Sequence, residues 1–246
     1  MNNFIEACLE SLQTGDPYPS FSEGSSDPTV ANAYATQQLF VAAQARPIAG
    51  YKAALTAAPA QQAMGIAAPV LGVLFEQGRS RPLDHVAVPG GGVLETELGF
   101  TLAQDITSPV TPASVLDRVD CCHTMVEVAK PNLSGKPSGI DLIATNSASY
   151  HFIEGTEFAP QTIEIDDLQA ELTYEGETVF TGRCGDVMGG QRDALAWLIN
   201  TLLSVGYTLT AGQILMTGSV GGVAPSKPGQ YQGLFSGLGE IGFTIV

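Results

Sequence analysis

Two glutamates, Glu95 and Glu97, stand two residues apart within an apolar stretch, GVLETELGFTL at 92–102. On a β-strand, residues i and i+2 project from the same face, so both carboxylates would enter the same space. Two negative charges that close repel each other and need a shared proton or a bound cation. The spacing therefore indicates carboxylate chemistry, unless the pair lies on the solvent face of an edge strand, where Glu-x-Glu is common.

A third acid, Glu127, lies in a similar apolar setting, TMVEVA at 124–129, and could complete a three-carboxylate site. Ligation by oxygen alone favours a hard divalent ion such as Mg²⁺, Mn²⁺ or Ca²⁺. His123 shares the face of Glu127 on a regular strand and could hydrogen-bond beside the ligands. A single histidine among apolar residues is, however, more often a hydrogen-bonded core group.

The overall charge excludes a phosphate-backbone partner. The chain of 246 residues has a net charge of −15 and a pI near 4.3, so nucleic acid would be repelled. Hydrophobic residues make up 44% of the chain and charged residues only 14%, which suggests that much surface is buried, partly between subunits. We therefore expect a homo-oligomer.

No segment reads as a membrane or export signal. The N-terminal residues lack a basic region followed by a long apolar core, and the small-residue stretch 55–75 is interrupted by Pro59 and Pro69. A cytoplasmic protein without a membrane partner is predicted. The four cysteines show no CxxC spacing, and neighbours such as Cys121 and Cys122 rarely bond to each other, so buried reduced thiols are expected.

The chain begins with helical patterns and continues with strand-like ones. Helices are predicted at 29–45, with Asp27 as N-cap and Pro28 as first helical residue, and at 59–64, 113–119 and 191–205. Strands are predicted at 93–102, 124–129, 140–144, 168–174, 178–181, 214–217 and 241–246. This order favours an α+β fold with a mainly β core.

Several segments taken together resemble the 2-keto-4-pentenoate hydratase group of the fumarylacetoacetate hydrolase superfamily. They are GYKAALT at 50–56, QAMG at 62–65, PVLG at 69–72, ETELGF at 95–100, DLIATN at 141–146, ALAWLIN at 194–200 and AGQILMTGS at 211–219. The resemblance implies a β-rich, barrel-like core with an N-terminal helical part. Residues 1–75 would form the helical segment and the lysine-bearing strand, and residues 76–246 the catalytic core, as one functional unit.

The resemblance also implies a chemistry. Three acids, matching Glu95, Glu97 and Glu127, would hold Mg²⁺ or Mn²⁺, and Lys52 falls on the active-site lysine of the group. A 2-hydroxydienoate or its 2-oxo tautomer would bind the cation, and water would add across the activated double bond in the catabolism of aromatic compounds. Asn146, Ser147 and Ser219 lie at matching loops and could bind substrate oxygens or cap turns. A surface position for Lys52 is the alternative.

The chain departs from the hydratase pattern at one catalytic position. Hydratases of the group usually carry an acid within Pro-Asp-aromatic-Gly, whereas this chain has Val70 in PVLG. The related 4-oxalocrotonate decarboxylases also lack that acid, which makes decarboxylation the second reading. After the third acid the hydratases typically continue Val-Asp-Ser-Arg, whereas this chain continues VAKPN at 128–132, so that Lys130 changes the charge there. Together with Val70, this change makes a non-catalytic partner subunit the third interpretation. The retained acids favour an enzyme, with hydro-lyase activity first.

One further pattern resembles a catalytic dyad. His151 precedes Glu154 with the His-x-x-Glu spacing used by the hydrolase branch of the superfamily. It lies well after the metal motif and not in the N-terminal loop where that branch places it. We therefore expect His151 to be dispensable.

Overall fold

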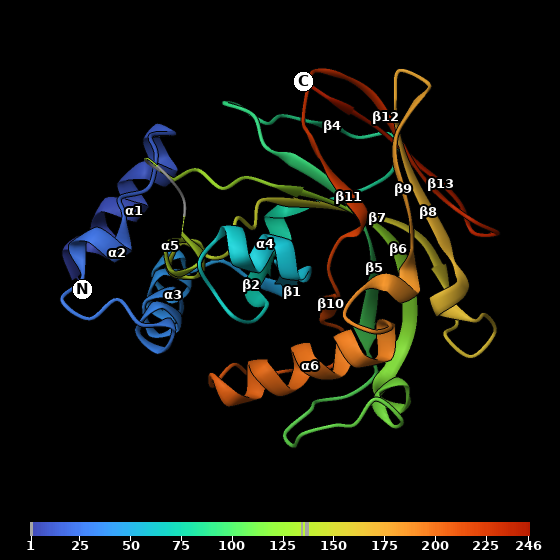
Figure 1. The fold of residues 1–246 in the computed structure, drawn as a ribbon, viewed down its shortest axis with the longest axis horizontal. Coiled ribbons are helices and arrows are strands. Elements are labelled where there is room, and N and C mark those ends of the chain that lie inside the picture. Colours follow the sequence, from blue (N-terminus) through green and yellow to red (C-terminus); the bar gives the residue numbers. More distant parts are fainter. Residues whose placement is uncertain (1, 134, 136–137) are drawn as a thin grey trace.

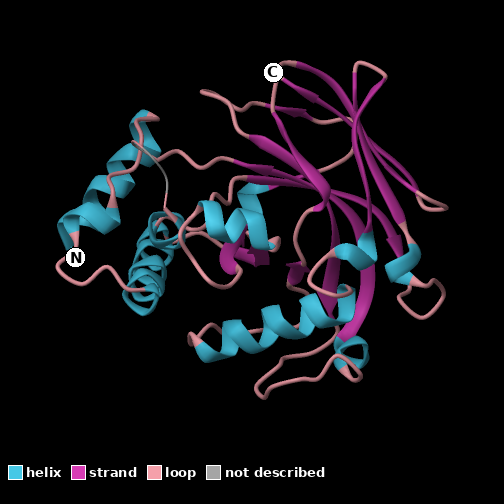
Figure 2. Ribbon diagram, viewed as in Figure 1, coloured by secondary structure: helices cyan, strands magenta, loops and turns pink. Residues whose placement is uncertain are grey.

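Two β-sheets occupy one side of the molecule, and helices gather beside and below them (Figures 1 and 2). The computed structural model describes residues 2–133, 135 and 138–246. The helices are α1 (Asn2–Thr14), α2 (Phe21–Gly24), α3 (Val30–Gln44), α4 (Ala58–Ala63), α5 (Gly139–Ala144) and α6 (Gln191–Ser204), with 3₁₀ turns η1 (Glu76–Gly78), η2 (Val115–Arg118), η3 (Ile165–Asp167) and η4 (Cys184–Asp186).

The larger sheet holds eight strands. Its order is β2 (Val70–Phe75), β1 (Ile48–Ala54), β10 (Ile214–Met216), β5 (Val93–Leu102), β6 (Val119–Ala129), β7 (His151–Phe158) and β3 (Arg79–Ser80), with β11 (Val220–Pro225) paired to β5 outside this path. Strands β1 and β10 are parallel, and β5, β6 and β7 are mutually antiparallel. Strands from residues 1–75 and from residues 76–246 thus share one sheet. The predicted division of the chain into these two segments stays a prediction.

The smaller sheet holds five strands, in the order β4 (His85–Val86), β13 (Gly239–Ile245), β12 (Gly229–Phe235), β8 (Gln169–Tyr174) and β9 (Glu177–Arg183). It packs on the larger one where Gly233 of β12 faces β6, since a Cβ on Gly233 would lie only 2.9 Å from Val126 Cγ2. Alternate residues of β5 and β6, including Leu94 and Leu98, are buried on the core side. The intervening residues project to the opposite face, which is where Glu95, Glu97 and Glu127 lie.

This architecture confirms the predicted α+β class with a mainly β core. Most predicted elements are present, among them β5 with the predicted bounds, the β8–β9 hairpin and α6. Six strands were not predicted, namely β2, β3, β4, β7, β11 and β12. Strands β3 and β4 have only two residues each, and β7, β11 and β12 carry several glycines or charged residues that weaken the alternating pattern.

One predicted strand was wrong, because residues 140–144 form helix α5. Ser138 caps this helix by accepting a hydrogen bond from Asp141 N at 3.1 Å. The Asp141 carboxylate in turn accepts hydrogen bonds from the Ser22 backbone N–H at 2.8 Å and from the Ser20 hydroxyl, which anchor α5 to α2, and from the Ser138 hydroxyl at the start of α5. A short apolar run cannot be assigned to strand or helix from its periodicity alone, and these tertiary hydrogen bonds decide it.

Two helix boundaries also differ from the prediction. Helix α3 starts at Val30 with Thr29 as its cap, because the Thr29 side chain accepts from Asn32 N. The predicted helix at 113–119 is only the 3₁₀ turn η2, since Val119 already pairs with Leu102 as the first residue of β6.

The sequence predicts no membrane-spanning segment and reduced, buried cysteines. Among the residues that the structure describes, none of the helices combines the length and the apolar character that a bilayer crossing requires. All four cysteines are free thiols, as predicted, but only Cys8, Cys122 and Cys184 are buried, whereas Cys121 is half-buried.

Candidate metal centre

The register of β5 against β6 brings the three glutamates together. Glu95 pairs directly with Glu127, and Glu97 lies one residue pair further along the same face, opposite Met125. Carboxylate oxygens of the three side chains lie within 4.8 Å of one another. Both strands lie inside the sheet, Glu97 and Glu127 are 0% and 1% exposed, and Glu95 is half-buried. The alternative that Glu95 and Glu97 lie on the solvent face of an edge strand is therefore wrong.

Lys52 reaches the same place from β1. Its Nζ lies 2.9 Å from Glu127 Oε1, and the side chain is 2% exposed, so the surface alternative for Lys52 is also wrong. Strands β10 and β5 lie between β1 and β6, and a flat sheet would hold β1 and β6 about 14 Å apart. The sheet must therefore curl, and its concave face holds the lysine and the carboxylates.

The electrostatics of this cluster are those of concentrated negative charge. Burial and the Glu127 carboxylate raise the pKa of Glu95 to about 7, although Lys52 and Ser219 act against them. Burial, Glu127 and Glu95 also raise the pKa of Glu97 well above its usual value. Burial disfavours the charged form of Lys52, but the three surrounding carboxylates outweigh it and raise the pKa of Lys52. The ammonium is thus kept charged beside carboxylates that resist losing their protons.

The carboxylate oxygens have too few hydrogen-bond donors for their burial. Glu97 Oε2 accepts a hydrogen bond from Gly218 N at 2.8 Å. Glu97 Oε1 and Glu127 Oε2, however, have no hydrogen-bond partner among the described residues. When ionised, three carboxylates and one ammonium carry a charge of −2, which one divalent ion would neutralise. The residues present therefore fit a hard divalent cation.

Two of the three predicted substrate-binding residues, Asn146 and Ser147, bond to the backbone of strand β2. The Asn146 amide accepts from Val73 N at 2.7 Å and donates to Val73 O at 2.9 Å, and the Ser147 hydroxyl donates to Leu71 O at 2.6 Å. Both side chains thereby fix the loop after α5 against β2. Their role in substrate binding stays a prediction.

The third, Ser219, lies at the metal centre. It is half-buried next to Glu95, whose pKa it lowers, and its hydroxyl donates to Gly222 O at 2.7 Å.

Two glycines contribute to the candidate centre and were not identified from the sequence. The first is Gly218, whose backbone N–H donates a hydrogen bond to the Glu97 carboxylate. The sequence TGS at 217–219, a turn pattern directly after a predicted strand, was the signal that could have indicated it.

Gly72 is the second glycine of the centre that the sequence did not indicate. It pairs with Lys52 across β1 and β2, and a Cβ there would lie 2.9 Å from Asn146 O and 3.3 Å from Lys52 Cε. Val70, two residues earlier on β2, is 2% exposed and packs in the main apolar core.

The histidines do not join the carboxylates. His123 contacts Thr101 and Cys121 through Nε2. Glu154, the acid of the His-x-x-Glu pattern, forms an ion pair with Arg79, and its Oε1 lies 3.5 Å from His123 Nδ1. His151 packs edge-on against the Tyr150 ring instead. These contacts give no support to a dyad of His151 and Glu154.

Comparison with known proteins places this geometry in a family. Residues 43–235 match the model of the fumarylacetoacetate (FAA) hydrolase C-terminal domain, which is most of the chain. The chain belongs to the fumarylacetoacetate hydrolase family. Among curated relatives in this family, a 2-keto-4-pentenoate hydratase of Paraburkholderia xenovorans is 27% identical over 96% of this chain and 91% of its own length. A 4-oxalocrotonate decarboxylase of Pseudomonas sp. (strain CF600) is 28% identical over 89% of this chain and 88% of its own.

A solved structure of the fumarylacetoacetate hydrolase family has the same fold. The 4-oxalocrotonate decarboxylase from Pseudomonas putida G7, complexed with magnesium and adipate, superposes with a TM-score of 0.92 at 22% identity, covering 99% of this chain and 96% of that one. The predicted family and fold are therefore confirmed. The names of the curated relatives agree with the predicted enzyme class, a hydratase with a decarboxylase as its near relative.

Proposed function

We propose that the protein is a metal-dependent hydro-lyase that hydrates 2-hydroxypenta-2,4-dienoate or a similar 2-oxo acid in the catabolism of aromatic compounds. The observation that carries this proposal is the buried cluster of Glu95, Glu97 and Glu127 with Lys52. Four ionisable groups at one buried point are costly to the fold unless a ligand compensates them, and a 2-oxo acid with a divalent cation does so. The hydratase names of relatives spanning nearly the whole chain support the substrate class.

The three carboxylates would hold the cation, which we propose to be Mg²⁺ or Mn²⁺. Once bound, the ion would supply Lewis-acid stabilisation for the negative charge that develops on the 2-oxygen. Lys52 keeps its proton at neutral pH, so its ammonium attracts the substrate carboxylate and can donate a proton to the carbon chain. The Gly218 N–H fixes the Glu97 carboxylate, which leaves Glu97 Oε1 free for the ion.

The second candidate is decarboxylation of a 2-oxo acid of the 4-oxalocrotonate type, and Val70 favours it. Hydration requires a group that moves a proton from water, and the buried Val70 side chain has none. Loss of CO₂ from a 2-oxo acid needs stabilisation of the resulting enolate but no activated water. The 28% identical relative that is a decarboxylase keeps this candidate close to the first.

One pair of assays separates the two reactions. Purified protein with Mg²⁺ is incubated with 2-hydroxypenta-2,4-dienoate, whose dienoate absorbance is followed, and separately with 2-oxohex-3-enedioate, from which CO₂ release is measured. We expect absorbance loss in the first assay. CO₂ release without hydration would favour the decarboxylase, and neither reaction, with metal bound, would favour a non-catalytic partner subunit.

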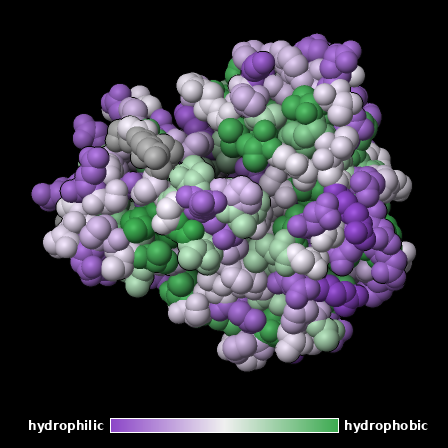
Figure 3. All heavy atoms as spheres, in the orientation of Figure 1, coloured by the Kyte–Doolittle hydropathy of each residue, from purple (hydrophilic) through white to green (hydrophobic). Residues whose placement is uncertain are grey.

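Three further parts of the proposal are independent of the reaction. Asn146, Ser147 and Ser219 border the site and are proposed to contact the substrate. The protein is proposed to be cytoplasmic and to act without membrane or nucleic-acid partners. It is also proposed to be a homo-oligomer, because large apolar side chains remain exposed, and Figure 3 shows apolar atoms gathered over α3 and beside the C-terminal strands.

A further inference from the structure

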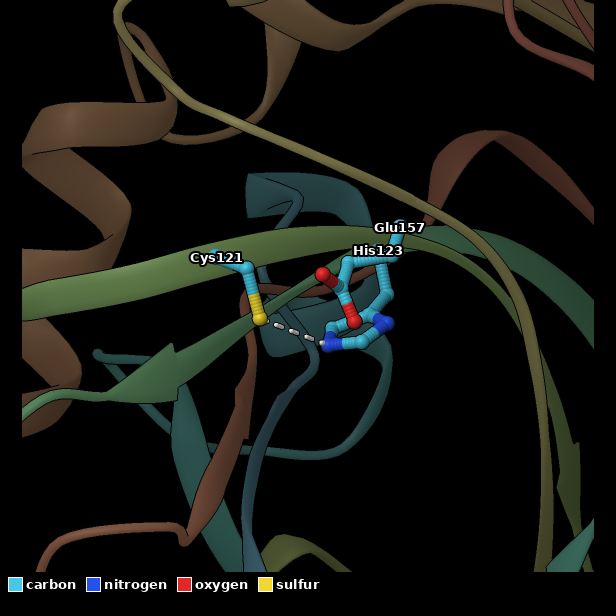
Figure 4. A group of neighbouring side chains, drawn as sticks. All are labelled: Cys121, His123 and Glu157. Carbon is cyan, nitrogen blue, oxygen red and sulfur yellow. Dashed lines mark hydrogen bonds between the residues drawn. The ribbon is translucent and has the colours of Figure 1, made fainter.

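A second group of metal-ligating side chains lies on strands β6 and β7, away from the three carboxylates. Cys121 and His123 alternate along β6 and share a face, and Glu157 of β7 pairs with His123 across the ladder. Figure 4 shows the three side chains converging from the two strands. One ligand atom from each lies within 4.8 Å of the others, and Cys121 Sγ is 3.3 Å from His123 Nε2.

This cluster is separate from the carboxylate centre. Met125 lies between His123 and Glu127 on the same face of β6. It is part of a fully buried apolar group that includes Phe152, Ile214 and Met216. An ion at one place would therefore have no ligand in common with an ion at the other.

The surroundings of His123 orient its ring for ligation. Nδ1 is buried and faces Glu154 Oε1 at 3.5 Å, and Glu154 is itself held by an ion pair with Arg79. A carboxylate on that side favours the tautomer with the proton on Nδ1. The Nε2 lone pair then accepts a hydrogen bond from the Thr101 hydroxyl at 3.0 Å, and a metal ion would take the place of that hydroxyl. Carboxylates commonly support metal-binding histidines in this way.

We propose that Cys121, His123 and Glu157 form a second metal site, selective for a borderline ion such as Zn²⁺. One thiolate, one imidazole and one carboxylate are the ligand types of zinc sites, and a fourth position would remain for water. Cys121 is half-buried and Glu157 is exposed, so an ion can enter from solvent. The thiolate and the imidazole disfavour Mg²⁺, which the carboxylate centre would take.

Such an ion would bridge β6 and β7 at an irregular point of the sheet. The β6–β7 register shifts between His123 and Met125, because Gly155 and Thr156 form a bulge before Glu157. At this bulge the Thr156 backbone N–H donates to the Thr124 hydroxyl at 2.9 Å instead of to a ladder carbonyl, and a metal ion would add a second link between the two strands. The site would thus stabilise the pairing of β7 with β6, the strand that carries Glu127.

Co²⁺ distinguishes the proposed second site from the carboxylate centre, because only the second site has a sulfur ligand. The protein is titrated with Co²⁺ in excess Mg²⁺, and the near-ultraviolet band of a thiolate-to-cobalt charge transfer is recorded. The expected result is a band that saturates at one Co²⁺ per chain and disappears when Zn²⁺ is added. The same band should form in Glu97→Gln, because the carboxylate centre supplies no sulfur.

Variants locate the site. Cys121→Ser should abolish the band, and His123→Ala and Glu157→Gln should weaken Co²⁺ binding by about 100-fold, while Glu154→Gln, which only orients His123, should weaken it by about 10-fold. The matched controls are Cys122→Ser, at the adjacent thiol on the other face of β6, and His85→Ala, at an exposed histidine. Both should keep the band, and circular dichroism verifies that each variant is folded.

Two outcomes would overturn the proposal. One is the absence of a sulfur band in the wild-type protein at millimolar Co²⁺. The other is a band that persists in folded Cys121→Ser, which would place the ion at another cysteine.

Discussion

At the scale of single residues, the candidate metal centre brings together three carboxylates that repel one another and one ammonium that attracts them. Glu95 and Glu127 face each other across a strand pair, an arrangement that is unfavourable for like charges. Lys52 compensates only one carboxylate directly, and Glu97 Oε1 and Glu127 Oε2 have no hydrogen-bond partner among the described residues. The arrangement of these four side chains therefore favours the binding of a cation over the stability of the protein without one.

Glu97→Gln should weaken Mg²⁺ binding by about 10- to 100-fold while the fold is kept. The amide has the same shape and can still accept the Gly218 N–H, but it removes one of the charges that bind the ion. Isothermal calorimetry measures the loss, with Glu177→Gln on the exposed strand β9 as control. A Glu97→Gln protein that does not fold would instead assign Glu97 a structural role.

Without metal, the same carboxylates should make stability fall as pH rises. The pKa of Glu97 in the folded chain is raised above its unfolded value of 4.5, so its favourable contribution is fully present below pH 4.5 and is lost as pH rises through the folded pKa. In the presence of a chelator, the wild type should therefore lose stability from pH 5 to pH 8, and Glu97→Gln should lose less. Urea unfolding at both pH values measures this, and parallel curves would contradict it.

Lys52→Ala should lower turnover by about 100-fold or more, the effect of losing an acid/base or orienting group. The physical reason is that Lys52 is the ammonium paired with Glu127 in the buried centre. Steady-state kinetics with the exposed Lys227→Ala as control provide the measurement. An unchanged rate in a folded Lys52→Ala protein would exclude Lys52 from the reaction.

At the scale of elements, the loop after α5 supports the strand opposite Lys52. Asn146, Ser147 and Ala148 all have positive φ angles, of 69°, 50° and 60°, which is unfavourable for residues with a side chain. The Asn146 amide and the Ser147 hydroxyl hold this conformation by bonding to Val73 and Leu71 of β2. Gly72 lies between these two residues and leaves room for the lysine side chain.

Asn146→Ala should destabilise the protein by roughly 2–4 kcal/mol, because it leaves the buried N–H and C=O of Val73 without partners. Alanine also tolerates a positive φ less well than asparagine does. Thermal unfolding measures the effect, with Ser149→Ala in the same loop as control. A stable Asn146→Ala protein with weakened substrate binding would instead support the predicted substrate contact.

Strand β7 carries His151 and Glu154, and for His151 we expect no role in the reaction. His151→Ala should leave turnover nearly unchanged, since Glu154 is engaged by Arg79 and His123 and not by His151. A collapse of the rate in a folded His151→Ala protein would restore the dyad as a catalytic element.

At the scale of the whole molecule, the curl of the larger sheet creates the centre. Lys52 and Glu127 meet across two intervening strands only because the sheet bends around them. The smaller sheet packs on the other face, and α6 lies across the lower side of the strands in Figure 1. Val70 of β2, which stands where hydratases of the group usually carry an acid, is part of the main apolar core.

The sequence by itself predicted the type of chemistry. The spacing of Glu95 and Glu97 in an apolar strand, with Glu127 in another, indicated a cation site, because side chains alternate on a strand whatever the fold around it. The family resemblance then gave Lys52 its place and the α+β core its form. Strand β5 and helix α6 were predictable because long periodic patterns depend little on distant residues.

Only the tertiary structure decided which groups meet. The helical state of residues 140–144 depends on hydrogen bonds from Ser20 and Ser22, more than a hundred residues away in the chain. The pairing of Lys52 with Glu127 depends on the curl of a sheet, and the approach of Glu157 to His123 on a bulge in β7. Such contacts are long-range, and local sequence carries no record of the partner, so the register and curvature of the folded sheet had to supply them.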